Sequence, residues 1–199
     1  MQLSVVTLGH VHAEDLTALT PHFTKLEQLV LDIAPHDDLA KHRAELNRAV
    51  DAASDDWILI VREHEKIDHA VAKEIAAAMT AAKARGFRIR STPVYAGKPL
   101  LINFDKAGEL RLFHRRYFLR RGELAVQGTV IRLENELRSM SFESVAQHRE
   151  YLEKNSVPHS SLRRVLLFIR YAIGAGTLDA NTLRYLWLEA GFDSGRTRR

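Results

Sequence analysis

The sequence predicts an α/β fold with a helical C-terminal part. Short apolar, β-branched runs alternate with stretches of helical spacing over roughly the first two thirds of the chain, and the remainder shows helical patterns. A length of 199 residues with 46% hydrophobic residues suits one compact domain, or one domain with an appendage. We therefore expect an α/β domain over residues 1–138 and a helical extension packed on it over residues 139–199.

The N-terminal elements follow from local patterns. Leu3 to Leu8 is apolar and β-branched, which predicts the first strand, and Ala13 to His22 has the character of a short helix. Gln28 to Ile33 is predicted to be the second strand. Leu39 to Ala53 carries apolar residues at helical spacing, which predicts the helix that leads into the centre of the chain.

The central stretch is an apolar strand followed by ionisable groups. Trp57 to Val61 has the continuous apolar character of a strand that is buried on both faces, and residues 62–65 are all ionisable. Ligands of open α/β sheets bind beyond the carboxyl ends of the strands, so this cluster is expected to face a binding crevice. The alternative is a solvated turn. A helix follows, with Asp68 as its N-cap and Gly86 as its C-terminal stop.

Three further strands and three further helices are expected in the second half of the chain. The strands are Phe87 to Thr92, Leu100 to Phe104 and Glu109 to Arg116, the first of which alternates apolar and basic residues. The helices, each with an apolar face at helical spacing, are Phe142 to Lys154, Ser161 to Ile173 and Asp179 to Ala190.

Composition and charge narrow the class of protein. The absence of cysteine excludes a disulfide framework and thiolate metal sites. No signal-peptide pattern and no apolar run near the roughly 18 residues that span a bilayer are found, so we expect a cytoplasmic protein. The Arg-flanked segment Arg163 to Tyr171 leaves peripheral contact with the inner face of the membrane open. Gly-rich phosphate loops of the common types are absent.

The two halves of the chain differ in charge. Residues 1–100 carry 12 basic and 14 acidic side chains, a net charge of −2, whereas residues 101–199 carry 17 and 11, a net charge of +6. An anionic partner is therefore expected on the second half. Nucleic acid is disfavoured because no recognition motif accompanies the basic residues.

Two segments resemble known glycosyltransferases. The stretch from Trp57 to Glu65 is similar to the buried strand and metal-binding DxD signature of family 2 glycosyltransferases. Tyr95-Ala96-Gly97 and Glu109 to Arg116 resemble, in the same order, segments of sugar transferases that act on the lipopolysaccharide core. The resemblance implies a nucleotide-diphospho-sugar transferase (GT-A-like) mixed sheet flanked by helices, and a nucleotide-sugar or a glycan as the bound partner.

The resemblance also implies a nucleotide site whose acidic motif has been rewritten. Arg62 stands at the first Asp of the DxD signature, His64 stands at the second, and Glu65 matches the Glu that follows. Asp32 and Asp37 keep the spacing of two aspartates in the region that holds the base and ribose in the family. These five residues form the expected nucleotide-binding set.

The replaced carboxylates leave two interpretations of the motif. In the family, the carboxylates hold a divalent cation on the diphosphate of the donor. A Mg²⁺ or Mn²⁺ site in this chain would have to use Glu63, His64 and Glu65, which is a poor set for a cation that prefers oxygen ligands. Arg62 could instead replace the metal as a fixed positive charge, and the presence of a metal therefore stays open.

The remaining site candidates lie in the basic half. Arg111, Arg115 and Arg116 are expected to bind phosphate or acceptor, since Arg forks suit phosphates and acidic glycans. A solvated basic edge strand is the alternative. Glu123 keeps the Glu of a His-Glu pair of the resembling transferases, which makes it the candidate general base, although a lone Glu is more often a surface residue.

Two functions therefore compete. The chain is either a degenerate glycosyltransferase-like domain that binds a nucleotide-sugar or glycan with weak or no transfer activity, or an active, metal-independent transferase acting on a cell-envelope glycan or lipopolysaccharide. The rewritten motif and a shortened N-terminal half favour the first function. Retention of Asp32, Asp37, Glu65 and Glu123 favours the second. A protein partner is a further expectation of the degenerate domain.

Overall fold

The computed structural model describes most of the chain as two compact units. The described residues are 1–33, 41–81, 83–100, 107–142, 144–155, 157–158, 168, 172, 179–190 and 192–193. The first unit comprises Met1–Ser91 and Asp105–Arg138, and the second comprises Thr92–Phe104 and Ser139–Arg199. Each unit has its own core, so each is treated separately below.

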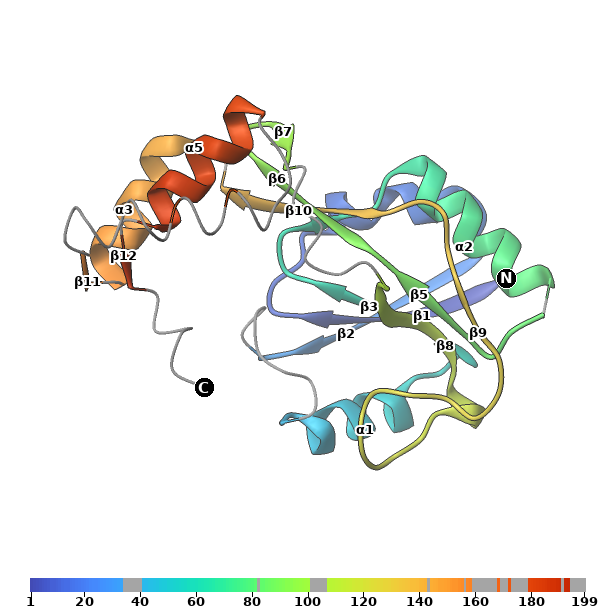
Figure 1. Cartoon of the computed structure of the whole chain (residues 1–199). Helices are drawn as coiled ribbons and strands as arrows, with labels where there is room; N and C mark the ends of the chain where they lie inside the picture. Colours follow the sequence, from blue (N-terminus) through green and yellow to red (C-terminus); the bar gives the residue numbers. More distant parts are fainter. Residues whose placement is uncertain are drawn as a thin grey trace. The chain divides into compact units, whose positions relative to one another are not determined.

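The first unit is built on a six-stranded mixed sheet (Figure 1). Its order is β2 (Lys25–Leu31), β1 (Gln2–Leu8), β3 (Trp57–Arg62), β8 (Glu109–His114), β5 (Gly86–Ile89) and β9 (Val130–Arg132). Strand β1 pairs in parallel with both β2 and β3. Strand β8 runs antiparallel to its neighbours β3 and β5, whereas β9 is parallel to β5. The predicted mixed α/β sheet is confirmed.

Alternation of side chains along the central strands creates two hydrophobic cores. Val5 and Leu59 pack on one face of the sheet against η1 (Ala13–His22) and α2 (His69–Ala81). Val6 and Ile60 pack on the other face against α1 (Arg43–Ala52). Figure 1 shows α1 and α2 on opposite sides of the sheet. Because β1 and β3 are buried on both faces, their continuous apolar character in the sequence is explained.

The helices of the first unit differ in kind. At the start of α2, the carboxylate of Asp68 accepts a hydrogen bond from Val71 N at 3.0 Å, which is the predicted N-cap. Element η1 is a 3₁₀ helix rather than the short α-helix that its composition suggests. Leu16 and Leu19 are both buried there, which fits three residues per turn, and Pro21 lies inside its last turn.

Several strand boundaries differ from the sequence prediction. The second strand begins at Lys25, three residues before the predicted Gln28. The predicted strand Phe87 to Thr92 is divided between β5 and β6 (Ser91–Tyr95). Strands β9 and β10 (Leu137–Phe142) were not predicted, and the three residues of β9 are all exposed, so no burial pattern marks them. Residues 101–104 of another predicted strand lie outside the described residues.

The second unit contains two described helices and a small core. Helices α3 (Val145–Asn155) and α5 (Ala180–Glu189) confirm two of the predicted helices, although Phe142, the predicted start of the first, belongs to β10. Most of Ser161 to Ile173 lies outside the described residues. Strands β6 and β7 (Lys98–Pro99) pair antiparallel, as do β11 (Val157–Pro158) and β12 (Phe192–Asp193). Among the helices described in either unit, none combines the length and apolar character that crossing a bilayer requires.

The core of the second unit is organised around a buried histidine. His148 is fully buried, and its Nδ1 lies 3.2 Å from the hydroxyl of Tyr95. The His148 ring stacks on Tyr185 at 5.1 Å between centroids, and its Nε2 lies 3.3 Å from a carboxylate oxygen of Glu189. Burial raises the pKa of Tyr95, which keeps its hydroxyl protonated and able to donate. The contact with Tyr95 provides Nδ1 of His148 with a polar partner, and the Glu189 carboxylate lies near Nε2, which lowers the cost of burying the ring.

Candidate functional site

The strand order places a topological switch between β1 and β3. Strand β1 has β2 on one side and β3 on the other. The chain passes from β1 to its neighbour β2 on one side and later returns to form β3 on the other side. In open α/β sheets, such a point at the carboxyl ends of the strands is where ligands bind. We call this region, formed by residues 9–10, 32 and 62–65, the carboxyl edge. It is where the sequence predicts the site.

Backbone hydrogen bonds and a glycine fix the carboxyl edge. Gly9 N donates to Leu31 O at 2.9 Å, and Glu63 N donates to Leu8 O at 2.8 Å, so the ends of three parallel strands are tied together. Gly9 has a φ of +77°, and a Cβ at this position would lie 2.6 Å from a carboxylate oxygen of Glu63. Glycine is therefore required both for the backbone conformation and for the close approach of Glu63.

The exposed polar groups of this edge are few. Asp32 is exposed directly after β2. His64 adopts a left-handed conformation with a φ of +66°, and its side chain is 58% exposed. Its Nε2 lies 3.8 Å from Oε1 of Glu63. Asp32, Glu63, His64 and the exposed His10 are available for hydrogen bonds to a ligand, while Asp37, the other predicted aspartate, lies outside the described residues.

Glu65 is buried and forms an ion pair with Arg111. Its side chain is 2% exposed, and Arg111 is equally buried. Arg111 donates from Nη1 to Oε2 at 3.2 Å and from Nη2 to Oε1 at 3.0 Å, which is a bidentate ion pair. The backbone N–H of Arg62 adds a hydrogen bond to Oε2 at 2.8 Å. Both carboxylate oxygens of Glu65 are thus engaged inside the protein.

Glu109 extends this pair into a four-residue network. Its Oε2 lies 2.9 Å from Nη2 of Arg111 and 3.1 Å from Nη2 of Arg62. The Glu109 side chain is 46% exposed, whereas that of Arg62 is 17% exposed. Two guanidinium groups therefore face two carboxylates, and the positive charge that the sequence places at this strand end is balanced internally.

A β-bulge brings Arg111 into this network. Along the β5–β8 pair, Phe87 lies opposite Leu112 and Arg88 lies opposite Leu110, so Arg111 is an extra residue in β8. Leu110 and Leu112 consequently pack into different cores, on opposite faces of the sheet. Regular alternation would place these two leucines on one face. The sequence alone gives no sign of the bulge, so the burial of Arg111 was not predicted.

The three arginines predicted to bind phosphate or acceptor are not brought together. Arg111 contacts residues that follow β3, whereas Arg115 lies at the opposite end of β8, with its Nε 3.2 Å from Oδ1 of Asp56. Arg116 is exposed in η2 (Arg115–Tyr117), and its backbone N–H donates to Nδ1 of His114 at 3.3 Å. The three side chains therefore do not form one phosphate clamp.

Glu123, the predicted base, is exposed in the loop after η2. Arg43 at the start of α1 donates to the Glu123 backbone carbonyl at 3.3 Å, which places this segment beside α1. No contact among the described residues joins the Glu123 carboxylate to Arg62, His64 or Glu65. Among the described contacts, none orients the Glu123 carboxylate as a general base, and this role stays a prediction.

The expected metal ligands do not converge. Within the described part of the chain, no three His, Cys, Asp or Glu side chains are arranged so that they could hold a metal ion. Of the expected set Glu63, His64 and Glu65, the third is buried and paired with Arg111. A divalent cation would have to displace that guanidinium to reach Glu65, so the residues present do not fit a Mg²⁺ or Mn²⁺ site.

Comparisons with known proteins yield a distant structural similarity. No protein-family model matches the chain, and no curated protein matches it. Among solved structures, TarS residues 1–349 from S. aureus aligns with a TM-score of 0.40 and 12% identity, over 96% of this chain and 71% of that chain. A likeness this distant assigns neither a family nor an activity to the chain.

Proposed function

We propose that the chain is a glycosyltransferase-like domain that binds a nucleotide-sugar or a glycan at the carboxyl edge, with weak or no sugar transfer. The observation that carries the proposal is the network of Arg62, Glu65, Glu109 and Arg111 at the topological switch. This network lies at the strand end at which the resembling transferases bind their donor. Its carboxylates, however, are paired with arginines of the same chain.

Metal-dependent transfer needs carboxylates that are free to hold a cation. The cation neutralises the diphosphate that leaves the sugar. In this chain, Glu65 is held by Arg111, and the two positions of the DxD aspartates are occupied by Arg62 and His64. Asp32, Glu63 and His64 remain as hydrogen-bonding groups for ribose, base or sugar hydroxyls. Binding is supported by this inventory, whereas metal-assisted departure of the diphosphate is not.

A metal-independent transferase is the second candidate. It is favoured by the exposure of Glu109, because a half-exposed carboxylate can turn to solvent and leave Arg62 facing a diphosphate. Its acceptor would be a cell-envelope glycan or lipopolysaccharide, as the resemblance implies. No described contact supports Glu123 as the base for this reaction. A cytoplasmic location, contact with a membrane surface and a protein partner stay predictions from the sequence.

Calorimetric titration tests the proposal. We would titrate the full chain with UDP, GDP and UDP-sugars, in the presence of Mn²⁺ and again in the presence of a chelator. Binding that survives chelation and is weakened in Arg62→Ala supports a metal-independent binding site. Arg48→Ala is the matched control, because Arg48 is a 78% exposed arginine on α1, paired only with Glu45 of its own helix among the described contacts.

Three results would count against the proposal. Binding that requires Mn²⁺ would show that the rewritten motif still holds a metal. An absence of binding to every nucleotide and sugar nucleotide would remove the binding function. Turnover of a UDP-sugar in the presence of chelator, detected as released UDP, would favour the metal-independent transferase.

A further inference from the structure

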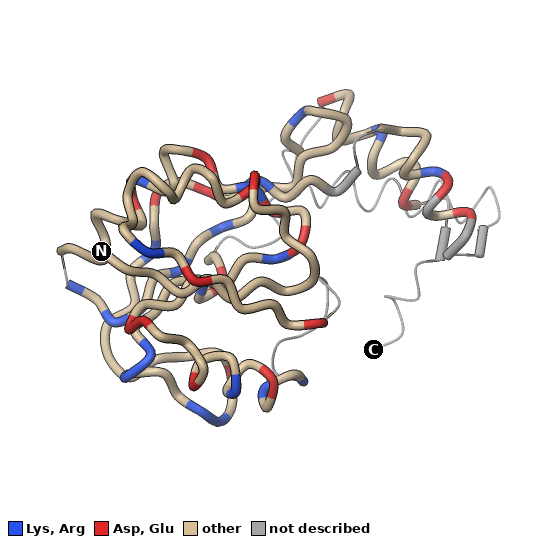
Figure 2. The backbone as a smooth tube through the Cα atoms, turned by 180° about the vertical axis from the view of Figure 1, so that it is seen from behind, with Lys and Arg blue, Asp and Glu red and all other residues tan. Residues whose placement is uncertain are grey.

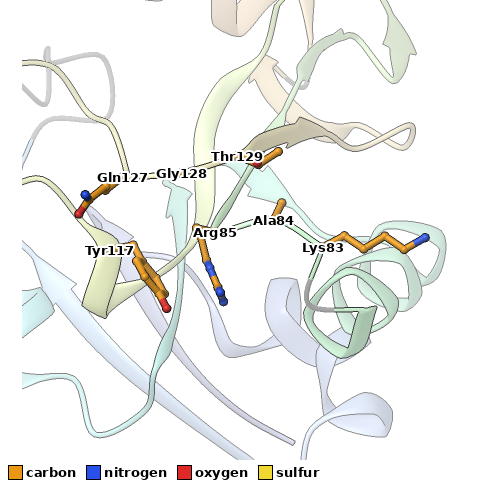
Figure 3. Close-up of a pocket in the computed structure, with 7 residues that line it drawn as sticks. All are labelled: Lys83, Ala84, Arg85, Tyr117, Gln127, Gly128 and Thr129. Atoms are coloured by element: carbon orange, nitrogen blue, oxygen red, sulfur yellow. The ribbon is translucent and has the colours of Figure 1, made fainter.

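A pocket of about 460 Å³ lies at the other end of the sheet (Figure 3). It is lined by residues that follow α2 and precede β5, by one residue of η2, and by the segment that leads into β9, namely Lys83, Ala84, Arg85, Tyr117, Gln127, Gly128 and Thr129. Strand β5 is parallel to β3, since both run antiparallel to β8, and the pocket lies where β5 begins. We call it the amino-edge pocket.

Arg85 is held in place at this pocket from both sides. Its backbone N–H donates to Thr129 O at 2.9 Å, and its carbonyl accepts from His114 N at 3.0 Å. Its guanidinium carbon lies 4.4 Å from the centre of the Tyr117 ring, and Figure 3 shows the two side chains extending side by side. This stacking restricts the guanidinium while leaving its N–H groups able to donate.

The segment 127–129 forms a wall that fits closely against Arg85. Gln127 N donates to Tyr117 O at 2.7 Å, which ties this segment to η2. Gly128 has a φ of +119°, and a Cβ there would lie 3.0 Å from Cγ of Arg85. Glycine is thus required where the backbone passes over the arginine stem. Backbone hydrogen bonds thus hold the segment 127–129 against η2 and Arg85.

The charge of the amino-edge pocket is not balanced by nearby acids. Its lining contains Lys83 and Arg85 and no acidic residue. Among the described residues, no ion pair joins either cation to a carboxylate, in contrast to Arg62, Arg111 and Arg115. Burial lowers the pKa of His114, Asp56 opposes this shift, and Arg85 is the first of the nearby cations that add to it.

We propose that the amino-edge pocket binds the phosphate group of a small molecule. The Arg85 fork matches two phosphate oxygens. The side chains of Gln127 and Thr129 point away from the guanidinium in Figure 3, and either one adds a neutral donor only after it turns toward the ligand. Lys83 extends away from Arg85 in Figure 3, and its exposed, flexible chain can turn toward a bound dianion. The volume is of the order that small-molecule sites occupy, about 300–1,000 Å³.

A small molecule fits the surroundings better than a nucleic acid strand. Arg115 and Arg120, which follow along the chain from β8, are paired with Asp56 and Asp51 at 3.2 and 2.7 Å. Figure 2 shows Lys and Arg positions interspersed with Asp and Glu along the backbone of the first unit. Two of the arginines that follow β8 are therefore neutralised, which leaves fewer cations beside the pocket for a polyanion. The inference does not depend on the proposed function of the carboxyl edge.

The test is an NMR titration of the ¹⁵N-labelled full chain with orthophosphate, glucose 1-phosphate and UMP. Binding of any of them should shift the amide signals of Arg85, Gly86 and residues 127–129. The tightest probe then identifies the source of the phosphate as free phosphate, a sugar phosphate or a nucleotide. Arg85→Gln should weaken binding about tenfold, since it removes a charge-assisted pair, while Arg48→Gln should leave it unchanged.

Lys83→Gln separates binding from folding, and Gly128→Ala tests the fit of the wall against Arg85. Lys83→Gln changes an exposed side chain and should weaken binding several-fold without changing the thermal unfolding midpoint. Gly128→Ala retains every charge but crowds the Arg85 stem, so it should weaken binding as well. The proposal is overturned if phosphate shifts only signals of the carboxyl edge, if Arg48→Gln and Arg85→Gln lose equal affinity, or if a short single-stranded oligonucleotide binds far more tightly than every small phosphate.

Discussion

The arginines at the two edges of the sheet differ in whether carboxylates balance their charge. At the carboxyl edge, Arg62 and Arg111 are enclosed with Glu65 and Glu109 in a network that has no excess positive charge. At the amino-edge pocket, Arg85 rests on an aromatic ring, and no described carboxylate pairs with it. Arginines that look alike in the sequence therefore differ in their capacity to attract an anion, because that capacity depends on local charge balance.

Burial explains this difference. A guanidinium taken out of water needs a carboxylate partner, since an isolated buried charge is very costly. Arg111 is 2% exposed and has two such partners. A half-buried arginine such as Arg85 keeps part of its hydration and can be held by stacking alone. The first arrangement stabilises structure, and the second retains a charge that can act on a ligand.

The largest effect is expected from breaking the network at its buried end. Glu65→Gln would leave Arg111 with only the half-exposed Glu109 as an anionic partner, and we expect a loss of about 3 kcal/mol in the free energy of unfolding. Urea denaturation measures this loss. Glu45→Gln, which removes a carboxylate paired on the surface of α1, is the control and should cost less than about 1 kcal/mol. Equal losses in both variants would contradict the structural role of Glu65.

Glycine substitutions test how tightly the carboxyl edge is built. Gly9→Ala introduces both an unfavourable φ and a clash with Glu63, and we expect a loss of about 2–3 kcal/mol. Gly122→Ala is a close control, because Gly122 has the same φ of +77° but no atom within 4 Å of its Cβ position. It should cost only about 1 kcal/mol. The difference between the two unfolding free energies measures the clash, and its absence would show that Glu63 yields freely.

Removing Glu109 sharpens the comparison of the two edges. Glu109→Gln withdraws the exposed counter-charge of Arg62, so UDP should bind the carboxyl edge about threefold more tightly, the scale of one exposed ion pair. Glu136→Gln, which removes a carboxylate paired with Arg90, serves as the control in the same calorimetric titration. Unchanged UDP affinity in Glu109→Gln would mean that Arg62 does not face the ligand.

The smallest expected effect is on the pH dependence of stability, through His114 at the end of β8. The pKa of His114 is lowered by burial, so its neutral form is favoured in the folded state. Below its ordinary pKa of 6.5, the unfolded chain binds a proton that the folded chain resists, and stability falls as the pH decreases through this window. His114→Gln should reduce the loss of unfolding free energy between about pH 7 and about pH 5. The exposed His12→Gln is the control, and equal losses in the two variants would contradict this role.

Residues with strong periodicity were predicted well. Trp57 to Val61, the stripe of α2 and the cap at Asp68 follow from side-chain spacing and local hydrogen bonding, which need no tertiary information. The location of ionisable groups at the end of β3 follows in the same way. The order β2-β1-β3 makes that strand end a switch point, and the crevice expected there stays a prediction.

Partners of the charged side chains could not be predicted. The pattern Leu110-Arg111-Leu112 indicates an outward-facing arginine, and the bulge in β8 overrides it. The separation of Arg111 from Arg115 depends on where β8 ends against β3, which is a long-range property. The amino-edge pocket was missed because Arg85 and Gly128 lie far apart in the sequence and meet only through the pairing of β5 with β9.

That pairing also has a kinetic consequence. The hydrogen bond between Arg85 N and Thr129 O closes a loop of about 44 residues that contains the whole of β8. Contacts of such sequence separation form late, because the chain loses the entropy of the loop before it gains the contact. The walls of the amino-edge pocket therefore meet only once this long-range contact has formed. A phosphate that binds there would select fully folded chains and slow their local opening, which amide hydrogen exchange of β9 would reveal.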